Sequence, residues 1–172
     1  MNGRAIGWAR GIGFVAGFAV AMTAVLSWRI PAGTGTLGAD LSVVALRTGE
    51  LTVSTSAPFL VAGGMRPGSA ATGSVDVHND SGSDLRVAVA AQSSSSDLDD
   101  LLWLEVDAAG EDLFRGPLSD LLEGTEKGFE IGPGNTTTLG VRGWLPTSVD
   151  GGFEGRSVDL ALVMTPRAVT GS

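Results

Sequence analysis

Apolar and polar residues alternate along two neighbouring stretches near the middle of the chain. In the first stretch Val75 and Val77 alternate with polar residues, and in the second Leu85 and Val87 alternate with smaller or charged ones. A period of two is typical of strands that bury one face and leave the other in water. The polar turn at residues 79–84 separates the stretches, so the pattern predicts a β-hairpin, the unit of an antiparallel sandwich.

Shorter apolar stretches on both sides predict further strands. These cover residues 40–45, 50–54, 102–106, 136–145 and 157–169. One helical turn is expected to begin at Ser96, a good N-cap residue, and a second to follow Pro117 and end at Gly124. The fold class predicted is all-β: an antiparallel, jelly-roll-like β-sandwich with one or two short helical turns.

The first thirty residues have a different character. Residues 1–10 carry Arg4 and Arg10 without any acidic residue, and residues 11–28 form an uncharged apolar run. This order is typical of an export signal. The run lies between the ~7–15 apolar residues of a cleaved signal peptide and the ~20 of a membrane span. Small residues follow it, which favours cleavage, while an uncleaved membrane anchor is the alternative.

This pattern predicts three parts of the chain. Residues 1–30 form the apolar signal or anchor helix, residues 31–38 a flexible Gly/Thr-rich linker, and residues 39–172 the β-sandwich domain. We therefore expect a secreted protein, extracellular or at the cell surface. Membrane contact is expected only through residues 1–30, if they are retained.

Charge and composition narrow the functional classes. Three of the eleven Lys and Arg residues and none of the nineteen Asp and Glu residues fall in residues 1–30, so residues 31–172 carry a net charge of −11. Such an acidic domain is unsuited to nucleic acid, whose phosphates require Lys and Arg. The chain has no Cys, so neither disulfides nor thiolate metal sites are available and stability must come from packing.

Several short motifs follow one another in a fixed order. They are the Pro67-Gly68 turn before a strand that ends in an Asn-rich turn, the segment GPLSDL at 116–121, the Pro-Gly-led strand at 133–141, Leu145-Pro146, and the Gly-rich turn into the last strand at 153–163. This order, which covers about residues 37–166, resembles the TasA/camelysin-like family of bacterial cell-surface and biofilm-matrix proteins. The resemblance implies an exported structural subunit of extracellular fibres or of a biofilm-type surface matrix, without a cofactor.

The same resemblance implies how subunits associate. Proteins of this family are understood to build fibres by β-strand donation, in which an N-terminal segment of one subunit completes the sheet of the next. The candidate donor strand follows the flexible linker and consists of Asp40, Leu41, Ser42, Val43, Val44, Ala45 and Leu46. The same pattern also fits a first strand folded back on its own domain, so both uses remain open. Self-association into fibres is the expected partnership, with other matrix proteins as further candidate partners.

The resemblance also raises peptidase activity as a function to test on the residues, because the family has been described as containing a metallopeptidase. Zinc hydrolysis needs several imidazole or carboxylate ligands and a general base. His78 is the only histidine, and it lies on the polar side of a predicted strand. No Gly-x-Ser-x-Gly motif is present for a serine hydrolase. We therefore expect no enzymatic activity, with a camelysin-like metallopeptidase or another surface hydrolase as a less favoured alternative.

Two binding features complete the prediction. Asp97, Asp99 and Asp100 are weak candidates for calcium ligands, because calcium favours clustered carboxylates on loops. A membrane-tethered binding module that uses such acidic loops is the alternative function. Five aromatic residues of the domain are expected in its core or at its rim: Trp103, Phe114, Phe129, Trp144 and Phe153. A sugar-binding platform is the less favoured use of these side chains.

Overall fold

The computed structural model describes residues 38–95, 97–125 and 127–169. The predicted signal or anchor at 1–30, most of the linker and the predicted N-cap Ser96 lie outside these described residues. The described core residues all fall between Ala39 and Met164 in one compact unit, so this part of the chain has a hydrophobic core of its own. Within the described ranges, no helix is long and apolar enough to cross a membrane.

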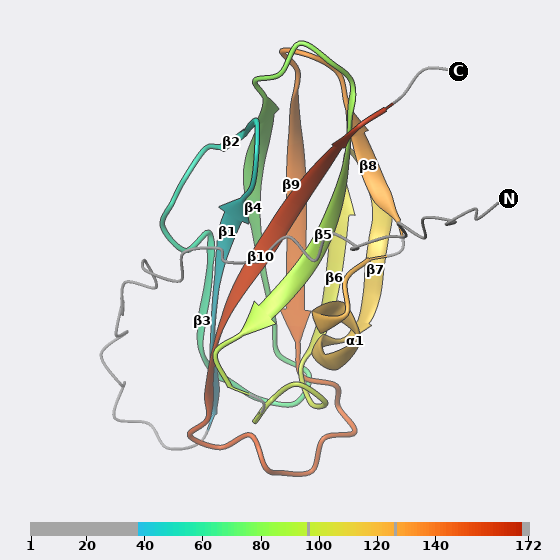
Figure 1. The fold of residues 1–172 in the computed structure, drawn as a ribbon. Helices are drawn as coiled ribbons and strands as arrows, with labels where there is room; N and C mark the ends of the chain where they lie inside the picture. The colour runs from blue at the N-terminus through green and yellow to red at the C-terminus, as the bar shows by residue number, and fades with distance from the viewer. Residues whose placement is uncertain (1–37, 96, 126, 170–172) are drawn as a thin grey trace, which may run out of the picture. The chain divides into compact units, whose positions relative to one another are not determined.

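The domain is an all-β sandwich of two five-stranded sheets (Figure 1). Sheet A has the order β3-β1-β10-β5-β8, and sheet B has the order β2-β4-β9-β6-β7. The strands are β1 (Ala39–Arg47), β2 (Leu51–Val53), β3 (Leu60–Met65), β4 (Ala70–Asn79), β5 (Leu85–Ser93), β6 (Trp103–Ala108), β7 (Glu111–Pro117), β8 (Gly128–Ile131), β9 (Thr136–Trp144) and β10 (Ser157–Ala168), with one short helix, α1 (Leu118–Leu122). The predicted all-β sandwich is confirmed.

Alternation along the strands builds the core between the sheets. Val75 and Val77 of β4 are 2% and 0% exposed, and Leu85 and Val87 of β5 are 5% and 0% exposed, so all four enter the core. Asp76 and Arg86, which lie between them in the sequence, point outward. The predicted helical turn is also confirmed, because α1 follows Pro117 and the chain leaves it at Gly124 with a positive φ of 93°. The period of two thus identified which face of each long strand is buried.

The predicted hairpin between β4 and β5 is wrong. β4 pairs with β2 and β9 in sheet B, while β5 pairs with β10 and β8 in sheet A. The connection at residues 80–84 therefore crosses from one sheet to the other. Asn79, which is fully buried, holds this crossing: its side-chain amide donates to the backbone oxygens of Ser83 at 2.8 Å and Ile131 at 2.9 Å, and its Oδ1 accepts from Ser81.

The predicted antiparallel arrangement fails for one pair of strands. β1 runs parallel to β10 over eight paired positions, from Asp40 opposite Ser157 to Arg47 opposite Met164. The other described pairs are antiparallel. A parallel pair needs a long connection, and here almost the whole domain forms it, because β1 and β10 are the first and last described strands.

Three strands lie where the pattern predicted none: β3, β7 and β8. Each lies at the edge of its sheet. Their sequences give weak signals, since β3 contains Gly63 and Gly64, β7 ends in Gly116 and Pro117, and β8 has only four residues. Edge strands need bury only part of one face, so alternation marks them poorly.

The aromatic prediction is partly confirmed. Phe129 and Phe153 are buried in the core at 4% and 6% exposure, and Phe114 is half-buried against it. Trp103 is 36% exposed. It lies beside Trp144 on the outer face of sheet B, because both belong to positions that alternate with core residues. For Trp103 the favoured core prediction is therefore wrong.

Candidate functional site

The predicted donor segment, residues 40–46, forms most of β1 and lies inside a sheet of its own domain (Figure 1). On one side it pairs in parallel with β10, and on the other it pairs antiparallel with β3. We call the space between β3 and β10 that β1 fills the β1 slot. In the single chain, β1 thus pairs within its own domain, which is the second of the two predicted uses. Donation of β1 to another chain stays a prediction.

Every second side chain of β1 enters the core. Ala39, Leu41, Val43 and Ala45 are at most 5% exposed, and Val43 is completely buried. Completely burying a side chain of this size contributes about 1.5–3 kcal/mol. The β1 slot is therefore part of the hydrophobic core, and a chain whose slot is empty exposes apolar surface to water.

Two glycines shape the slot to the strand that fills it. Gly143 of β9 lies opposite Leu41 across the core, and a Cβ at this position would come within 2.7 Å of Leu41 Cδ2. At the start of β1, a Cβ on Gly38 would clash with the backbone of Gly64. Gly143 fits the register in which Leu41 lies opposite it, and Gly38 fits the register in which β1 begins beside the Gly64 backbone. A shift of β1 by one residue would turn its buried face outward.

Polar contacts fix the same register from the ends of the strand. At the first end, Asp40 Oδ1 accepts a hydrogen bond from the Gly64 amide at 2.8 Å, and the Asp40 amide donates to Arg156 O at 2.9 Å. At the other end, the Thr48 hydroxyl donates to Met164 O at 3.1 Å. Both charged residues of β1, Asp40 and Arg47, lie near its ends, so its middle is apolar and uncharged.

We predict that Gly38→Ala destabilises the domain by about 2 kcal/mol, the usual effect of forcing extra atoms into a close contact. The reason is the short distance to the Gly64 backbone, which the new methyl group can relieve only by moving the start of β1. Urea unfolding measures the effect. Gly82→Ala is the control, because no atom lies within 4 Å of a Cβ there. Equal stability of both variants would contradict the tight seating of β1.

The predicted calcium ligands share a loop without converging on one point. Asp97 and Asp100 are exposed, while one carboxylate oxygen of Asp99 is buried and has no hydrogen-bond partner. The backbone oxygens of Asp97 and Asp99 accept from Arg156 and from the Ser119 amide, so the loop is held by its main chain. Among the described residues, no group of three His, Cys, Asp or Glu side chains is arranged to hold a metal ion.

His78 lies on the outer side of β4, as its place in the pattern predicted. Its Nδ1 is 3.0 Å from the Thr136 hydroxyl, and its Nε2 is 3.4 Å from Asp80 Oδ1. The side chain is 39% exposed. These contacts link the ends of β4 and β9, and His78 with Asp80 belongs to no group of three ligating side chains in the described part of the chain.

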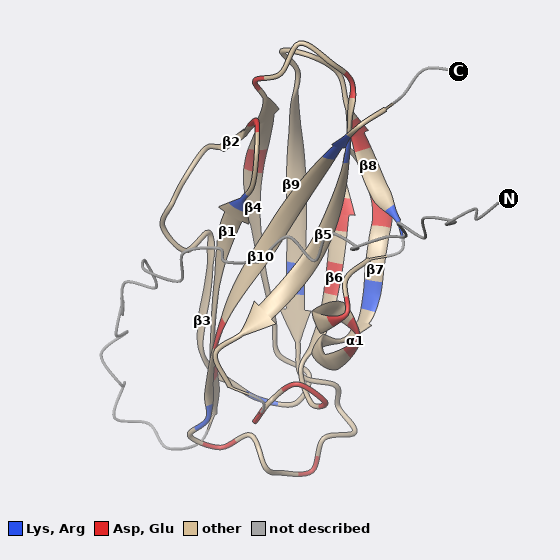
Figure 2. Cartoon of the chain, in the orientation of Figure 1, with Lys and Arg blue, Asp and Glu red and all other residues tan. Residues whose placement is uncertain are grey.

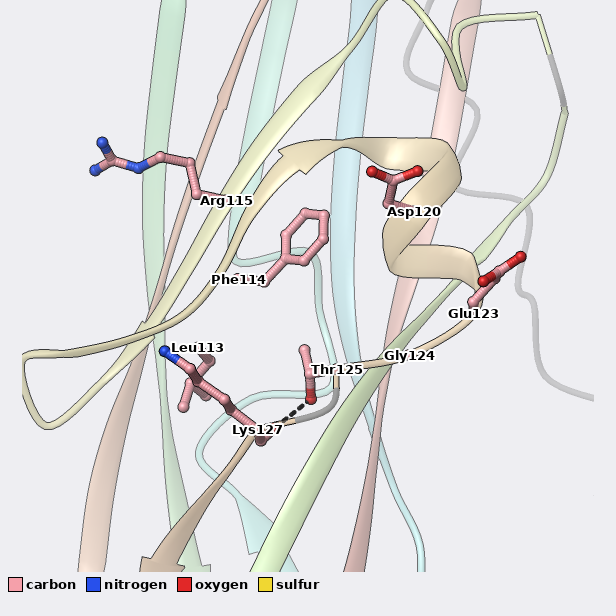
Figure 3. Close-up of a pocket in the computed structure, with 8 residues that line it drawn as sticks. All are labelled: Leu113, Phe114, Arg115, Asp120, Glu123, Gly124, Thr125 and Lys127. Carbon is pink, nitrogen blue, oxygen red and sulfur yellow. Dashed lines mark hydrogen bonds between the residues drawn. The ribbon is translucent and has the colours of Figure 1, made fainter.

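A hollow of about 540 Å³ lies between β7 and the segment that follows α1 (Figure 3). Leu113 and Phe114 form its apolar part, and charged side chains surround it. Figure 3 shows the Arg115 guanidinium directed away from the carboxylates of Asp120 and Glu123. The sequence pattern predicted no site here, and the lining residues do not bring opposite charges or a nucleophile and a base together.

The β1 slot is the candidate site, because the predicted donor segment fills it, is buried in it and fits its shape. Alternation and the position after a flexible linker predict the strand from Asp40 to Leu46, whereas nothing in the sequence marks Gly38 and Gly143 as the glycines that shape the slot. Comparison with known protein families gives no match for this chain, and comparison with curated protein sequences gives none either.

Proposed function

We propose that this protein is an exported structural subunit of extracellular fibres or of a biofilm-type surface matrix, and that β1 of one subunit fills the β1 slot of the next. The observation that carries the proposal is the place of β1. It is the first described strand, it follows a Gly/Thr-rich linker in the sequence, and it is the parallel neighbour of β10 in an otherwise antiparallel sandwich.

The strand order supports the interpretation of β1 as an added strand. Without β1 and β2, the remaining strands have the orders β3-β10-β5-β8 and β4-β9-β6-β7. β3 runs opposite to β10, because β3 is antiparallel and β10 parallel to β1. This is the order and direction of an eight-stranded jelly roll, into which β1 is inserted between two strands and beside which β2 extends the other sheet.

Exchange of β1 between identical chains conserves its contacts. The same side chains meet the same slot whether β1 comes from its own chain or from a neighbour, so the transfer costs little beyond the entropy of association. Each subunit that gives its β1 to a neighbour has an empty slot of its own. A head-to-tail contact of this kind generates filaments, except where the rotation between successive subunits closes a ring.

The chain offers a hinge for this exchange. Only three residues separate β1 from β2, and β2 is a three-residue edge strand held by β4. The next connection, residues 54–59, is longer and reaches up to about 20 Å when extended. We therefore place the hinge in residues 54–59, so that β1 and β2 leave together.

The surface of sheet A suits contact between copies. β3, at its edge, contains no charged residue, and its Val61 is 56% exposed (Figure 2). Natural edge strands usually carry charges that prevent pairing with other chains. The acidic residues lie mostly on loops and on β6, β7 and β8, away from β3.

A cysteine pair tests the donation directly, because the chain has no cysteine of its own. Ser42 of β1 and Val61 of β3 are direct partners in the antiparallel pair. The two substitutions Ser42→Cys and Val61→Cys are made in the protein that begins at Gly33. A disulfide between them joins β1 to the β3 beside which β1 lies, in its own subunit or in a neighbour. Fibres that are assembled under reducing conditions and then oxidised are expected to give a series of covalent multimers on non-reducing gels.

Arg86→Cys with Glu130→Cys is the matched control, since these partners in β5 and β8 belong to one chain in either state. It is expected to give only monomers on the same gels. Monomers of the Ser42 and Val61 variant that are oxidised before assembly are expected to form no fibres until they are reduced. Fibres that contain only monomeric bands would refute donation, and an absence of fibres at any concentration would refute the structural role and leave the membrane-tethered module as the better proposal.

A further inference from the structure

The outer face of sheet B carries an apolar row that crosses four strands. Trp103 of β6 pairs with Trp144 of β9 on one side and with Pro117 of β7 on the other, and Trp144 pairs with Ala70 of β4. Directly paired residues share a face of a sheet, so these four side chains lie in line. The ring centroids of Trp103 and Trp144 are 5.9 Å apart.

A polar row runs beside it, two residues further along each strand. Arg142 of β9, Glu105 of β6 and Arg115 of β7 are neighbours there. Glu105 forms an ion pair with Arg115 and lies 4.0 Å from Arg142, whose guanidinium lies 5.6 Å from the centroid of the Trp144 ring. The hydrogen bond to Glu105 and the attraction of its charge raise the pKa of Arg115, which stays a cation.

We propose that this face binds a neutral polysaccharide, with a sugar ring stacked on Trp103 and its hydroxyl groups bonded to the Arg142, Glu105 and Arg115 row. The C–H face of a pyranose is apolar and weakly positive, and it complements the electron-rich face of an indole ring. Hydroxyl groups both donate and accept, and the polar row offers guanidinium donors beside a carboxylate acceptor. This binding uses the outer face of sheet B around Trp103, whereas β2, the strand of sheet B that leaves with β1, pairs with β4 at residues 77–79, away from Ala70.

The charges favour a neutral polymer over an anionic one. Glu105 offsets the charge of one of its two arginine neighbours, so the row keeps a net charge of only +1. The residues around it are acidic, because Asp107 and Asp112 follow in the next row and the chain has a net charge of −8. The field of such a surface repels polyanions.

The geometry assigns the main contact to Trp103. Arg142 covers part of the Trp144 ring, whereas Trp103 is 36% exposed. The two indole planes are tilted by 47°, so one flat chain cannot lie on both rings. The contact between the two rings would also form if Trp103 and Trp144 served only to stabilise the sheet. The test must therefore separate an effect on binding from an effect on stability.

Native gel electrophoresis in gels that contain a soluble neutral polysaccharide provides this test. The probes are a β-1,3-glucan and hydroxyethylcellulose, with alginate as the anionic comparison. The protein beginning at Gly33 is expected to be retarded by at least one neutral polymer, at low and high salt alike. Trp103→Ala is expected to weaken retardation about tenfold, and Trp103→Phe, which keeps an aromatic face, to restore most of it.

Val61→Ala is the matched control, because it removes an exposed apolar side chain from the other sheet and is expected to bind as the parent does. Tryptophan fluorescence gives a second readout, since Trp103 and Trp144 are the only tryptophans after residue 33. Thermal unfolding of each variant separates lost binding from lost folding. Three results would overturn the proposal: no retardation by either neutral polymer, retardation by alginate alone, or unchanged binding of a folded Trp103→Ala variant. A change from dimer to monomer in that variant without any polysaccharide binding would instead identify a protein interface.

Discussion

Asn79→Ala is expected to lower the free energy of unfolding by about 3 kcal/mol or more, since each buried group that loses its partner costs about 1–3 kcal/mol. The Asn79 side chain is completely buried and satisfies four groups: the backbone oxygens of Ser83 and Ile131, and the amide and hydroxyl of Ser81. An alanine leaves all four without this partner at the point where the chain crosses between the sheets. Urea unfolding measures the loss.

Asn135→Ala is the control for this prediction. Asn135 lies in the facing turn, where its backbone oxygen accepts from the Asn79 amide at 3.0 Å, but its side chain is exposed. We expect a change within about 0.5 kcal/mol, the usual range for surface substitutions. A similar loss of stability in both variants would contradict the prediction. It would show that the loss does not come from the buried hydrogen bonds of the Asn79 side chain.

Leu41→Ala and Gly143→Ala are each expected to destabilise the domain, and their combination is expected to cost less than the sum of the two. Leu41→Ala removes a side chain that is 1% exposed, at a cost of about 2–5 kcal/mol. Gly143→Ala crowds the same place, where its methyl group would lie 2.7 Å from Leu41 Cδ2, and such overpacking costs about 1–3 kcal/mol. In the double variant the added methyl group enters the space that Leu41 leaves.

A double-mutant cycle from denaturant unfolding gives the coupling between the two sites, expected at about 1 kcal/mol or more in the direction of rescue. Val43→Ala combined with Gly143→Ala is the control, since Val43 is equally part of β1 but is not among the atoms within 4 Å of the Gly143 position. Additive effects of Leu41→Ala and Gly143→Ala would contradict the placement of β1 opposite β9. In assembled fibres the same pair would measure contacts between chains.

Alternation predicted the faces of the long strands but not their partners. The pattern correctly separated buried from exposed residues within the two strands, but it placed the buried Asn79 and Ser81 in a polar turn and joined β4 and β5 in one hairpin. Whether a polar turn folds a strand back on itself or carries it to the facing sheet depends on tertiary contacts. Here the burial of Asn79 against Ile131 O decides the question, and residue 131 is far away in sequence.

The candidate site shows the same limit. Residues 40–46 were identified as an apolar strand after a linker, because both features are local. The parallel partner β10 begins more than a hundred residues later, and no local pattern specifies it. Gly38 and Gly143 act through the space that they leave empty, and a missing side chain gives no signal unless the opposite strand is known. The exposure of Trp103 likewise depends on which face of β6 is turned to solvent, and this is set by the packing of the two sheets.

The place of β1 between two strands has a mechanical consequence. A strand that is pulled along its own axis loads the hydrogen bonds to β3 and β10 in shear, so they resist together instead of opening one after another. The four apolar side chains that β1 buries must also leave the core in the same step. If tension in a fibre passes through donated β1 strands, each joint would resist a lengthwise pull far better than a sideways peel.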